Sequence, residues 1–428
     1  MTSYKYPDSI QTALISLEKS GFSAFVVGGA VRDFFLNKEP HDYDIATNAT
    51  VNEMYEVFKD YKIIDTGLKH GTLTIHINHV EIEITCFRGS KNSLEEDLRL
   101  RDFTFNSMAM DKDYNLYDFC NGKIDLKNKI IRCNNEETFK NDPLRILRAI
   151  RQSGKFNFKI EEKTKKLMNR DCILLNNVSK ERISSELSQI LLCDNISNLI
   201  EDNLNIFTAI IPELKEIVGF HQNNPHHIYD VFRHTLKVLE NTPKILELRL
   251  AALFHDIGKP KCYSEDENGI GHFYNHEDVS EEIAFNILKR LKYDNKTIEF
   301  VCKLIMFHDY PLNNSKKNLR KLLNKFDDER IELLFHLKKA DVLGQNPNYN
   351  DRLDLIKKSE NIIEDIIKEG ACFSLKQLKI NGNDLIDLGI KNGKLIGDIL
   401  NSCLNKIIDG EIENDKDILL NMIKENYL

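Results

Sequence analysis

The chain has 428 residues and a mass of 49.7 kDa, which is more than one compact core normally supports and predicts at least two domains. Hydrophobic residues make up 41% and charged residues 29% of the sequence, a composition that excludes a disordered chain. The formal net charge of −8 excludes a protein that binds nucleic acid through positive charge spread over its whole surface, but it allows one local basic face.

Membrane and secretion signals are missing from the sequence. No stretch approaches the roughly 18 apolar residues of a membrane span, and residues 1–21 lack the basic and then apolar order of a signal peptide. The nine cysteines are scattered and form no C-x-x-C pair, which indicates reduced thiols, most of them in the core. We therefore expect a cytoplasmic protein with no membrane partner, whose oligomeric state the sequence leaves open.

The predicted elements divide the chain into an α+β head and a helical body. In the first 135 residues, strands are expected at 23–27, 62–65, 73–77 and 80–87. From Glu136 onward apolar residues recur at helical spacing, so an all-α body is expected, with a polar loop at 261–272. The clearest helical segments are 142–156, 179–192, 228–240, 245–259, 280–292 and 330–341.

A glycine pair follows the first predicted strand and precedes an apolar helix. Backbone N–H groups at Gly28 and Gly29 are suited to cradle phosphate oxygens there, and Arg32 lies one turn into the helix, where a guanidinium can contact phosphate. When the glycines are considered alone, a plain tight turn is the better explanation.

Two aspartates follow ten residues later. Asp42 and Asp44 are two residues apart on an extended segment and therefore point to the same face, where they repel each other unless a cation joins them. Mg²⁺ bound through carboxylates and substrate phosphates is the natural partner, and a pair of such ions supports phosphoryl transfer. A solvated Asp-x-Asp at a strand end is the alternative interpretation.

Further polar residues gather in two later segments. Around Arg101, Asp102 and Asn106 a cation, an acid and an amide stand together. Asp142 and Arg145 lie three apart at the start of a helix and can pair, with Arg148 one turn further. Besides an exposed salt bridge, a carboxylate and a guanidinium in this arrangement can present hydrogen-bonding edges to a base.

In this order, the four segments resemble the class II nucleotidyltransferases, which are the tRNA CCA-adding enzymes and bacterial poly(A) polymerases. The segments are VGGAVRD, HDYD, RDFTFNSMAMD and NDPLRILRAIR. The resemblance implies a polymerase β-like palm in the head, with Asp42 and Asp44 as catalytic metal ligands. It also implies transfer of C and A from CTP and ATP to the tRNA 3′ acceptor end without a nucleic-acid template. The implied nucleotide-binding residues are Gly28, Gly29, Arg32, Arg101, Asp102, Asn106, Asp142, Arg145 and Arg148.

The sequence departs from the family pattern at three places. Leu100 stands where a second arginine is usual, Asn141 stands where a glutamate is usual, and residues 88–94 are short where the family often has a longer loop. In the family that loop is associated with the switch from C to A addition, so an enzyme that adds only the two cytidines is one alternative. Glu83 aligns roughly with a strand acid of the family, and its role as a third metal ligand stays open.

A second set of chemically active residues lies in the helical body. His234, His255, Asp256 and Asp341 resemble the signature of HD-domain metal-dependent phosphohydrolases, and His276 and His308 stand where two-metal members have further ligands. The resemblance implies a divalent ion, with Mn²⁺, Ni²⁺, Fe²⁺ or Mg²⁺ favoured over zinc for mixed nitrogen and oxygen ligands. The implied substrates are phosphomonoesters or 2′,3′-cyclic phosphates.

Four domains follow from these assignments. They are a nucleotidyltransferase head at 1–135, a helical neck at 136–218, an HD domain at 219–345 and a C-terminal helical tail at 346–428. Between 140 and 170 there are ten basic and three acidic residues, a local positive stretch whose Arg151, Lys155 and Lys163 are candidate RNA contacts. The remaining alternatives are a bacterial poly(A) polymerase, an HD phosphohydrolase with an inactive head, and an RNA-binding protein in which both sites are inactive.

Overall fold

The computed structural model describes residues 5–64, 71–326 and 330–428, which form two compact units. The first unit runs to Asp194 and includes Asn198–Ile210, and the second contains Asn195–Ser197 and Ile211–Leu428. The end of the strand expected at 62–65 lies partly outside the described residues. The helices of the described residues include none that is long and apolar enough to cross a membrane.

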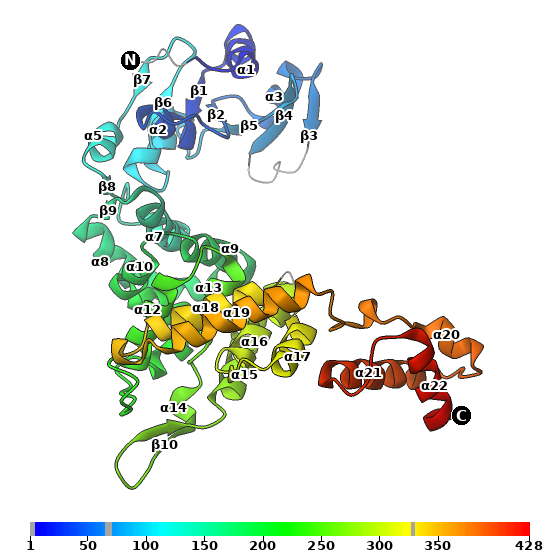
Figure 1. The fold of residues 1–428 in the computed structure, drawn as a ribbon. Helices are drawn as coiled ribbons and strands as arrows, with labels where there is room; N and C mark the ends of the chain where they lie inside the picture. The colour runs from blue at the N-terminus through cyan, green and yellow to red at the C-terminus, as the bar shows by residue number, and fades with distance from the viewer. Residues whose placement is uncertain (1–4, 65–70, 327–329) are drawn as a thin grey trace. The chain divides into compact units, whose positions relative to one another are not determined.

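A seven-stranded mixed sheet forms the head of the first unit, in the order β3-β4-β5-β2-β1-β6-β7 (Figure 1). β2 runs parallel to β5 and antiparallel to β1. The register pairs Val27 with Asp44 and Asp44 with Glu83, so the sheet brings the Gly28 turn at the end of β1 beside the acids of β2 and β5. The strands are β1 (Ala24–Val27), β2 (Asp44–Thr47), β3 (Lys62–Ile64), β4 (Thr72–Ile77), β5 (Val80–Cys86), β6 (Ala109–Met110) and β7 (Leu116–Tyr117).

Short helices cover this sheet. α1 (Asp8–Lys19) and α2 (Gly29–Phe35) contact β1, and α3 (Val51–Val57) contacts β4. α3 begins with a capping box, in which Thr50 and Glu53 satisfy each other's backbone N–H groups. α4 (Leu94–Arg99) follows β5, and its Leu98 joins Val27, Ala46 and Ala109 in the core of the sheet.

The rest of the first unit is helical, as the apolar spacing predicts. α7 (Arg145–Phe156) packs against α9 (Lys180–Leu191), and their facing apolar residues are fully buried. One short parallel pair, β8 (Ile130–Ile131) with β9 (Lys159–Ile160), was not expected, because two-residue strands carry no periodicity. The other helices are α5 (Gly122–Lys127), α6 (Thr138–Asn141), α8 (Glu162–Asp171), α10 (Ile196–Asp202) and α11 (Leu204–Ile210).

The second unit is a helical bundle followed by a small helical tail with its own core, in which Leu385, Cys403 and Leu419 are fully buried. The bundle helices are α12 (Val231–Asn241), α13 (Leu246–Phe254), α14 (Lys259–Cys262), α15 (His276–Arg290), α16 (Asn295–Phe307), α17 (Lys316–Phe326), α18 (Ile331–Leu343) and α19 (Arg352–Lys368). The tail helices are α20 (Gly382–Asp387), α21 (Gly393–Asp409) and α22 (Lys416–Tyr427).

Two local expectations for the second unit were wrong. The segment 261–272 is not a plain loop but a hairpin of β10 (Tyr263–Glu265) and β11 (Gly271–Phe273), whose turn is fixed by Asp266 accepting hydrogen bonds from the N–H groups of Asn268 and Ile270. The sequence also predicts Gly258 at the C-cap of the helix expected at 245–259; instead α13 ends at Phe254 with His255 at its C-cap, and Gly258, with a φ of −82°, directly precedes α14. It is needed for space, because a Cβ there would lie 2.6 Å from the backbone nitrogen of Ser280.

Candidate active sites

The first unit contains a pocket of about 390 Å³ beside the Gly28 turn. Every nucleotide-binding residue expected from the sequence lines it, and so does Asp44. Six arginines and three aspartates line the pocket, so positive charge prevails and an anionic ligand is favoured. The arginines are Arg32, Arg88, Arg101, Arg145, Arg148 and Arg182.

Gly28 gives the pocket floor its shape. Its φ is +70°, and a Cβ would lie 3.3 Å from Nη1 of Arg101 and 3.7 Å from Oδ2 of Asp44. The missing side chain therefore leaves these two charged groups open to a ligand. The N–H of Gly28 already donates to the carbonyl of Met108 at 3.3 Å, so this group is not free for the phosphate contact expected of it.

Acidic and amide partners fix three of the arginines in place. Arg101 contacts Asp97 at 2.9 Å through both Nε and Nη2, and Arg148 donates from the same two atoms to Oδ2 of Asp102. Arg32 donates to Asp33 and to Asn106. Burial would raise the pKa of Asp102, but Arg148, Asn106 and the N–H of Phe103 hold it below the usual value. The guanidinium groups are thus oriented before a ligand arrives.

The two aspartates expected to hold metal flank a buried residue, which agrees with the alternation expected of an extended segment. Asp42 and Asp44 are exposed, whereas Tyr43 between them is buried. Only Asp44 lies in β2 and lines the pocket; Asp42 precedes the strand. Desolvation raises the pKa of Asp44. Arg101 and Arg88 oppose this rise, whereas the negative charge of Asp42 adds to it. A hard divalent cation fits these donors, since it would relieve the repulsion between them.

Glu83 belongs to the same group of acids. It is the register partner of Asp44 on the neighbouring parallel strand, and desolvation, Asp44 and Glu81 all raise its pKa. The parallel pairing of β2 with β5, which the sequence did not predict, places Glu83 beside Asp44.

Asp142 and Arg145 do not pair with each other, although their spacing allowed it. Asp142 accepts a hydrogen bond from Arg182 at 2.9 Å, and Arg145 donates to the carbonyls of Leu100 and Thr138. The reason is that α6 ends at Asn141 and α7 begins at Arg145, so Asp142 has an extended backbone rather than a helical one. Both side chains line the pocket and leave hydrogen-bonding edges for a ligand.

Of the three candidate RNA contacts, two have acidic partners within the first unit. Arg151 contacts Glu186 at 2.6 Å and its side chain is only 14% exposed, whereas Lys163 contacts Glu136 and is exposed. The amine of Lys155 lies over the ring of Phe156.

Arg88 and Gln152 also line the pocket but belong to none of the recognised segments. For Arg88, the sequence feature that could have indicated a place in the pocket is its position directly after the strand expected at 80–87.

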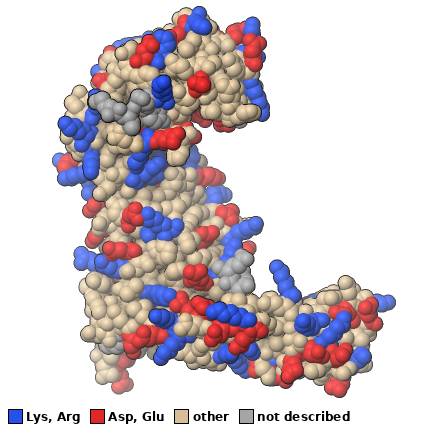
Figure 2. All heavy atoms as spheres, turned by 45° about the horizontal axis from the view of Figure 1, so that its top comes forward, with Lys and Arg blue, Asp and Glu red and all other residues tan. Residues whose placement is uncertain are grey.

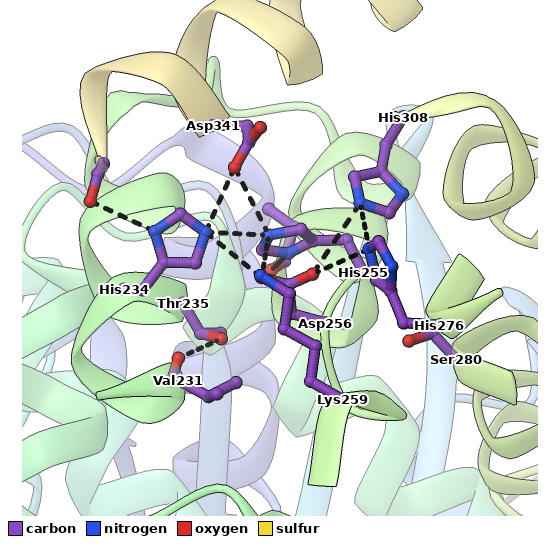
Figure 3. A network of polar contacts seen from close by, with 12 residues as sticks. Val231, His234, Thr235, His255, Asp256, Lys259, His276, Ser280, His308 and Asp341 are labelled. Atoms are coloured by element: carbon purple, nitrogen blue, oxygen red, sulfur yellow. Dashed lines mark hydrogen bonds and ion pairs between the residues drawn. The ribbon is translucent and has the colours of Figure 1, made fainter. Parts of the chain in front are cut away.

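In the second unit, the six residues expected to hold metal meet in one buried group, termed here the HD cluster: His234, His255, Asp256, His276, His308 and Asp341. His234, His255 and Asp341 form one set of potential ligand atoms within 4.8 Å of one another, and Asp256, His276 and His308 form another. Figure 3 shows Asp256 between the two sets, with Oδ2 3.3 Å from His234 and His255 and Oδ1 3.4 Å from His276.

Hydrogen bonds fix the tautomers of all four histidines. Each Nδ1 faces a backbone carbonyl, of Gly344, Ala252, Phe273 or Ile305, and must donate to it. In the neutral ring Nε2 is then an acceptor, yet Nε2 of His234 lies 3.2 Å from that of His255, and His276 and His308 face each other at 3.3 Å. Two acceptor nitrogens that face each other beside carboxylates require a positive charge between them. A cation bound by the nitrogen and carboxylate oxygen atoms of each set would supply that charge.

The electrostatics of the cluster lead to the same requirement. Burial lowers the pKa of His234, but Asp256 and Asp341 outweigh burial and raise it to about 9. His255 and Lys259 hold the pKa of Asp256 well below its usual value despite desolvation. The amine of Lys259 lies 2.6 Å from Oδ2 of Asp256 and donates to Gln222. The buried site therefore carries anionic carboxylates that attract cations.

The HD cluster opens into a pocket of about 410 Å³. Its lining includes residues outside the HD cluster, among them His227, Gln345 and Arg352. Burial lowers the pKa of His227 to about 2, so this imidazole stays neutral. No sequence pattern indicated these residues, because only folding brings them to the cluster.

Comparisons with known proteins cover most of the chain. Three family models match: "Poly A polymerase head domain" at 24–132, "Probable RNA and SrmB- binding site of polymerase A" at 157–218, and "tRNA nucleotidyltransferase domain 2 putative" at 264–423. Proteins named CCA-adding enzyme are similar over nearly the full length. The one from Ligilactobacillus salivarius is 30% identical, with 98% of this chain and 97% of the relative covered, and the one from Pediococcus pentosaceus is 28% identical, with 98% of each covered.

Solved structures share the fold. The Bacillus stearothermophilus CCA-adding enzyme in complex with CTP superimposes with a TM-score of 0.70 at 23% identity, over 98% of this chain and 97% of that one. The Thermotoga maritima CCA-adding enzyme complexed with tRNA_CCA gives a TM-score of 0.60 at 23% identity, over 98% and 95%. The α+β head with a helical body, expected from the sequence, is thereby confirmed.

Proposed function

This chain belongs to the family of CCA-adding enzymes, and we propose that the pocket of its first unit is where CTP and ATP are used. The protein is a tRNA nucleotidyltransferase that adds C and A to tRNA 3′ ends. One observation carries the assignment of the site: six arginines line the same pocket as Asp44 and the Gly28 turn, which is a setting for a triphosphate beside metal-binding carboxylates. We place the enzyme in the cytoplasm, where tRNA is processed in bacteria.

In the proposed site, each group has a separate task. Arg32, Arg101 and Arg148 bind the triphosphate, and Asp142 and Arg145 hydrogen-bond the edge of the incoming base, so that no template strand is required. The family uses a divalent ion, and we assign it as Mg²⁺ on Asp42 and Asp44, where it supplies positive charge to the reacting phosphate. The tRNA 3′ oxygen bonds to the α-phosphorus and pyrophosphate leaves.

A transfer assay tests this proposal. A tRNA transcript lacking CCA is incubated with CTP alone, ATP alone, or both, and the products are separated at single-nucleotide resolution. We expect two C residues with CTP and a complete CCA end with both nucleotides. Asp44→Ala should lower the rate at least about 1,000-fold, because removing a preorganised electrostatic group at the reacting centre costs on the order of 10²–10³ or more. Incorporation that survives this substitution would refute the site.

A narrower alternative is supported by one structural observation. Between β5 and α4 the chain makes a short connection held by hydrogen bonds from the N–H of Arg88 to Asp97, from the N–H of Lys91 to Glu96, and from Asn92 to the carbonyl of Asn48. A connection anchored in this way is poorly suited to a large rearrangement between C and A addition. A product that stops after two C residues, even with ATP present, would establish this alternative.

The HD cluster supports a second activity, metal-dependent hydrolysis of phosphate esters. Its facing Nε2 atoms and bridging Asp256 are suited to two divalent ions, with Mn²⁺, Ni²⁺, Fe²⁺ or Mg²⁺ preferred over zinc. Calorimetric titration with Mn²⁺ and hydrolysis of 2′,3′-cyclic AMP test it. His255→Ala should abolish both and leave CCA addition intact, whereas Asp44→Ala should do the reverse; joint loss in either variant would contradict the assignment of two separate sites.

A further inference from the structure

Two pockets adjoin at the HD cluster. The pocket of about 410 Å³ described above and a second one of about 380 Å³ share His308, Asp309, Asp341 and Arg352 among their lining residues. The cluster is therefore not at the bottom of one cavity, because it borders two cavities that are otherwise lined by different segments. Each falls within the range of roughly 300–1,000 Å³ that is typical of small-ligand sites.

The first pocket offers a flat aromatic surface. The rings of His272 and Tyr274, at the end of β11, stack with centroids 5.4 Å apart and an angle of 5° between their planes. Tyr274 is 70% exposed, and both residues line the pocket. An exposed ring beside a phosphate-binding centre is suited to stack on a nucleobase, an interaction worth about 1–3 kcal/mol per base in nucleic-acid-binding proteins.

Apart from Lys338 and the residues that it shares with the first pocket, the second pocket is lined by apolar and aromatic side chains. Leu312, Leu355 and Ile356 contribute its aliphatic walls, together with the ring of Tyr310. A phosphomonoester has a single organic substituent, which the first pocket can hold by itself. A second cavity of similar volume at the same centre matches a second substituent on phosphorus.

Arg352 stands where the two pockets adjoin. Its Nη1 donates to Oε1 of Gln345 at 2.8 Å, and Nε2 of Gln345 in turn donates to both carboxylate oxygens of Asp341. This chain of hydrogen bonds holds the guanidinium beside the cluster, and its side chain is still 41% exposed. Its Nη2 lies 3.9 Å from Oδ1 of Asp309, which is too far for a hydrogen bond, so the N–H groups on Nη2 can still donate to the non-bridging oxygens of a phosphate that lies between the pockets.

We infer that the HD site of this protein is built for linear phosphodiesters, with one substituent in each pocket and Arg352 on the non-bridging oxygens. The inference deepens the hydrolase activity proposed above and depends on it. In the reaction, the oxygen of water bonds to phosphorus and the bond from phosphorus to one ester oxygen breaks. That oxygen takes up a proton and leaves as an alcohol, and the other product is a phosphomonoester.

The first experiment compares a diester with the matching monoester. The probes are the dinucleoside monophosphate of deoxycytidine and deoxyadenosine, which contaminating ribonucleases do not cleave, and deoxycytidine 3′-monophosphate. The Mn²⁺-loaded full-length protein should have a kcat/KM at least about tenfold higher for the diester. Leu312→Trp, which fills the second pocket, should remove this preference by lowering diester hydrolysis about tenfold while changing monoester hydrolysis less than twofold. Equal rates for the two probes, or equal losses in the variant, would overturn the inference.

A binding experiment decides the inference without turnover. The chain contains no tryptophan, so Tyr310→Trp places a single fluorophore in the second pocket and Phe285→Trp, on an exposed aromatic of α15 outside both pockets, is its control. The measurement is made once with EDTA present and once with Mn²⁺ in a rapid-mixing instrument, before turnover begins. Under both conditions the diester should change the fluorescence emission of the Tyr310→Trp variant in a saturable way, whereas the monoester should leave it unchanged. An equal response to both probes, or no response to the diester, overturns the inference. Loss of Mn²⁺ binding and of all hydrolysis would instead refute the hydrolase proposal.

Discussion

At the scale of single residues, the head pocket is an arrangement of arginines that are held by neighbours. Arg101 is fixed by Asp97, Arg148 by Asp102 and Arg32 by Asn106, so little side-chain entropy is left to lose when a triphosphate binds. Arg88 differs, because its nearest acidic partner, Asp97, is 3.9 Å away and its side chain is 45% exposed. Desolvation and the neighbouring Arg101 lower its pKa, which indicates that this cation lacks a sufficient counter-charge until an anion binds.

Arg88→Ala should therefore weaken nucleotide binding more than it slows the chemical step. A hydrogen bond to a charged group contributes about 1.5–3 kcal/mol, so KM for CTP and ATP should rise on the order of 10- to 100-fold, with kcat changed much less. Steady-state kinetics on tRNA lacking CCA give both constants. Arg99→Ala, an exposed arginine that pairs with Glu95 outside the pocket, is the matched control and should leave KM unchanged.

Arg182 presents a different case, since it acts through another residue. It holds Asp142, which we propose reads the base, at 2.9 Å. Arg182→Ala should loosen the carboxylate and raise misincorporation of U or G relative to C about tenfold, while the unfolding temperature stays within about 2 °C, because the ion pair is exposed and contributes little stability. Product sequencing with all four nucleotides measures this, and unchanged selectivity would mean that Asp142 needs no such support.

At the scale of elements, close approach of backbones decides where the HD ligands lie. Gly258 separates Asp256 from α14, and its N–H donates to Oγ of Ser280 on α15, the helix that begins with His276. The turn and α15 therefore meet at a position where only glycine fits, and this contact sets the distance between Asp256 and His276.

Gly258→Ala should disturb both stability and metal binding. Its Cβ would lie 2.6 Å from a backbone nitrogen, so we expect a loss of about 1–3 kcal/mol in the free energy of unfolding and weaker Mn²⁺ binding. Gly397→Ala is the matched control: it lies inside α21 with no atom within 4 Å of the added Cβ, and it should stabilise the helix by about 0.5–1 kcal/mol. Urea unfolding and calorimetry compare the two variants, and equal effects would contradict the packing argument.

At the scale of the whole molecule, the property that bears on tRNA binding is the distribution of surface charge. Lysine and arginine are interspersed with acidic side chains on the face drawn in Figure 2, in keeping with the net charge of −8. The basic stretch at 140–170 is partly neutralised within its own unit, because Arg151, Lys163 and Arg170 contact Glu186, Glu136 and Asp171. We therefore expect fewer contacts between this stretch and RNA phosphates than the number of basic residues in it suggests.

Affinity for tRNA should accordingly depend on salt only moderately. With three or four phosphate contacts, the apparent dissociation constant should rise on the order of 10- to 100-fold between 50 and 200 mM salt. Filter binding of tRNA lacking CCA measures the slope. Lys155→Glu should lower the slope of this salt dependence by more than Lys163→Glu does, since Lys163 already has an acidic partner. A larger effect of Lys163→Glu would show that the ion pair between Lys163 and Glu136 breaks when RNA binds.

The sequence by itself determined the family and the α+β head with its helical body, and it indicated the residues from which both proposed sites are built. Short motifs carry this information, because residue types such as the glycine pair, the Asp-x-Asp and the HD signature are restricted by what they must contact. Spacing also predicted that Asp42 and Asp44 share a face, with which the exposure of both around the buried Tyr43 agrees, since side chains of an extended segment alternate with a period of two; the pairing of β2 with β5 brings Glu83 beside Asp44.

Only the tertiary structure decided which groups pair and what lies around each centre. Asp142 pairs with Arg182 rather than with Arg145, Gly258 is required by α15 rather than by a helix cap, and Arg352 reaches the HD cluster through Gln345. These contacts join residues whose separation in the sequence carries no periodic signal, so they depend on how the helices and strands pack. Local preferences specify the elements and the reactive side chains, whereas the partners and the pockets are products of packing.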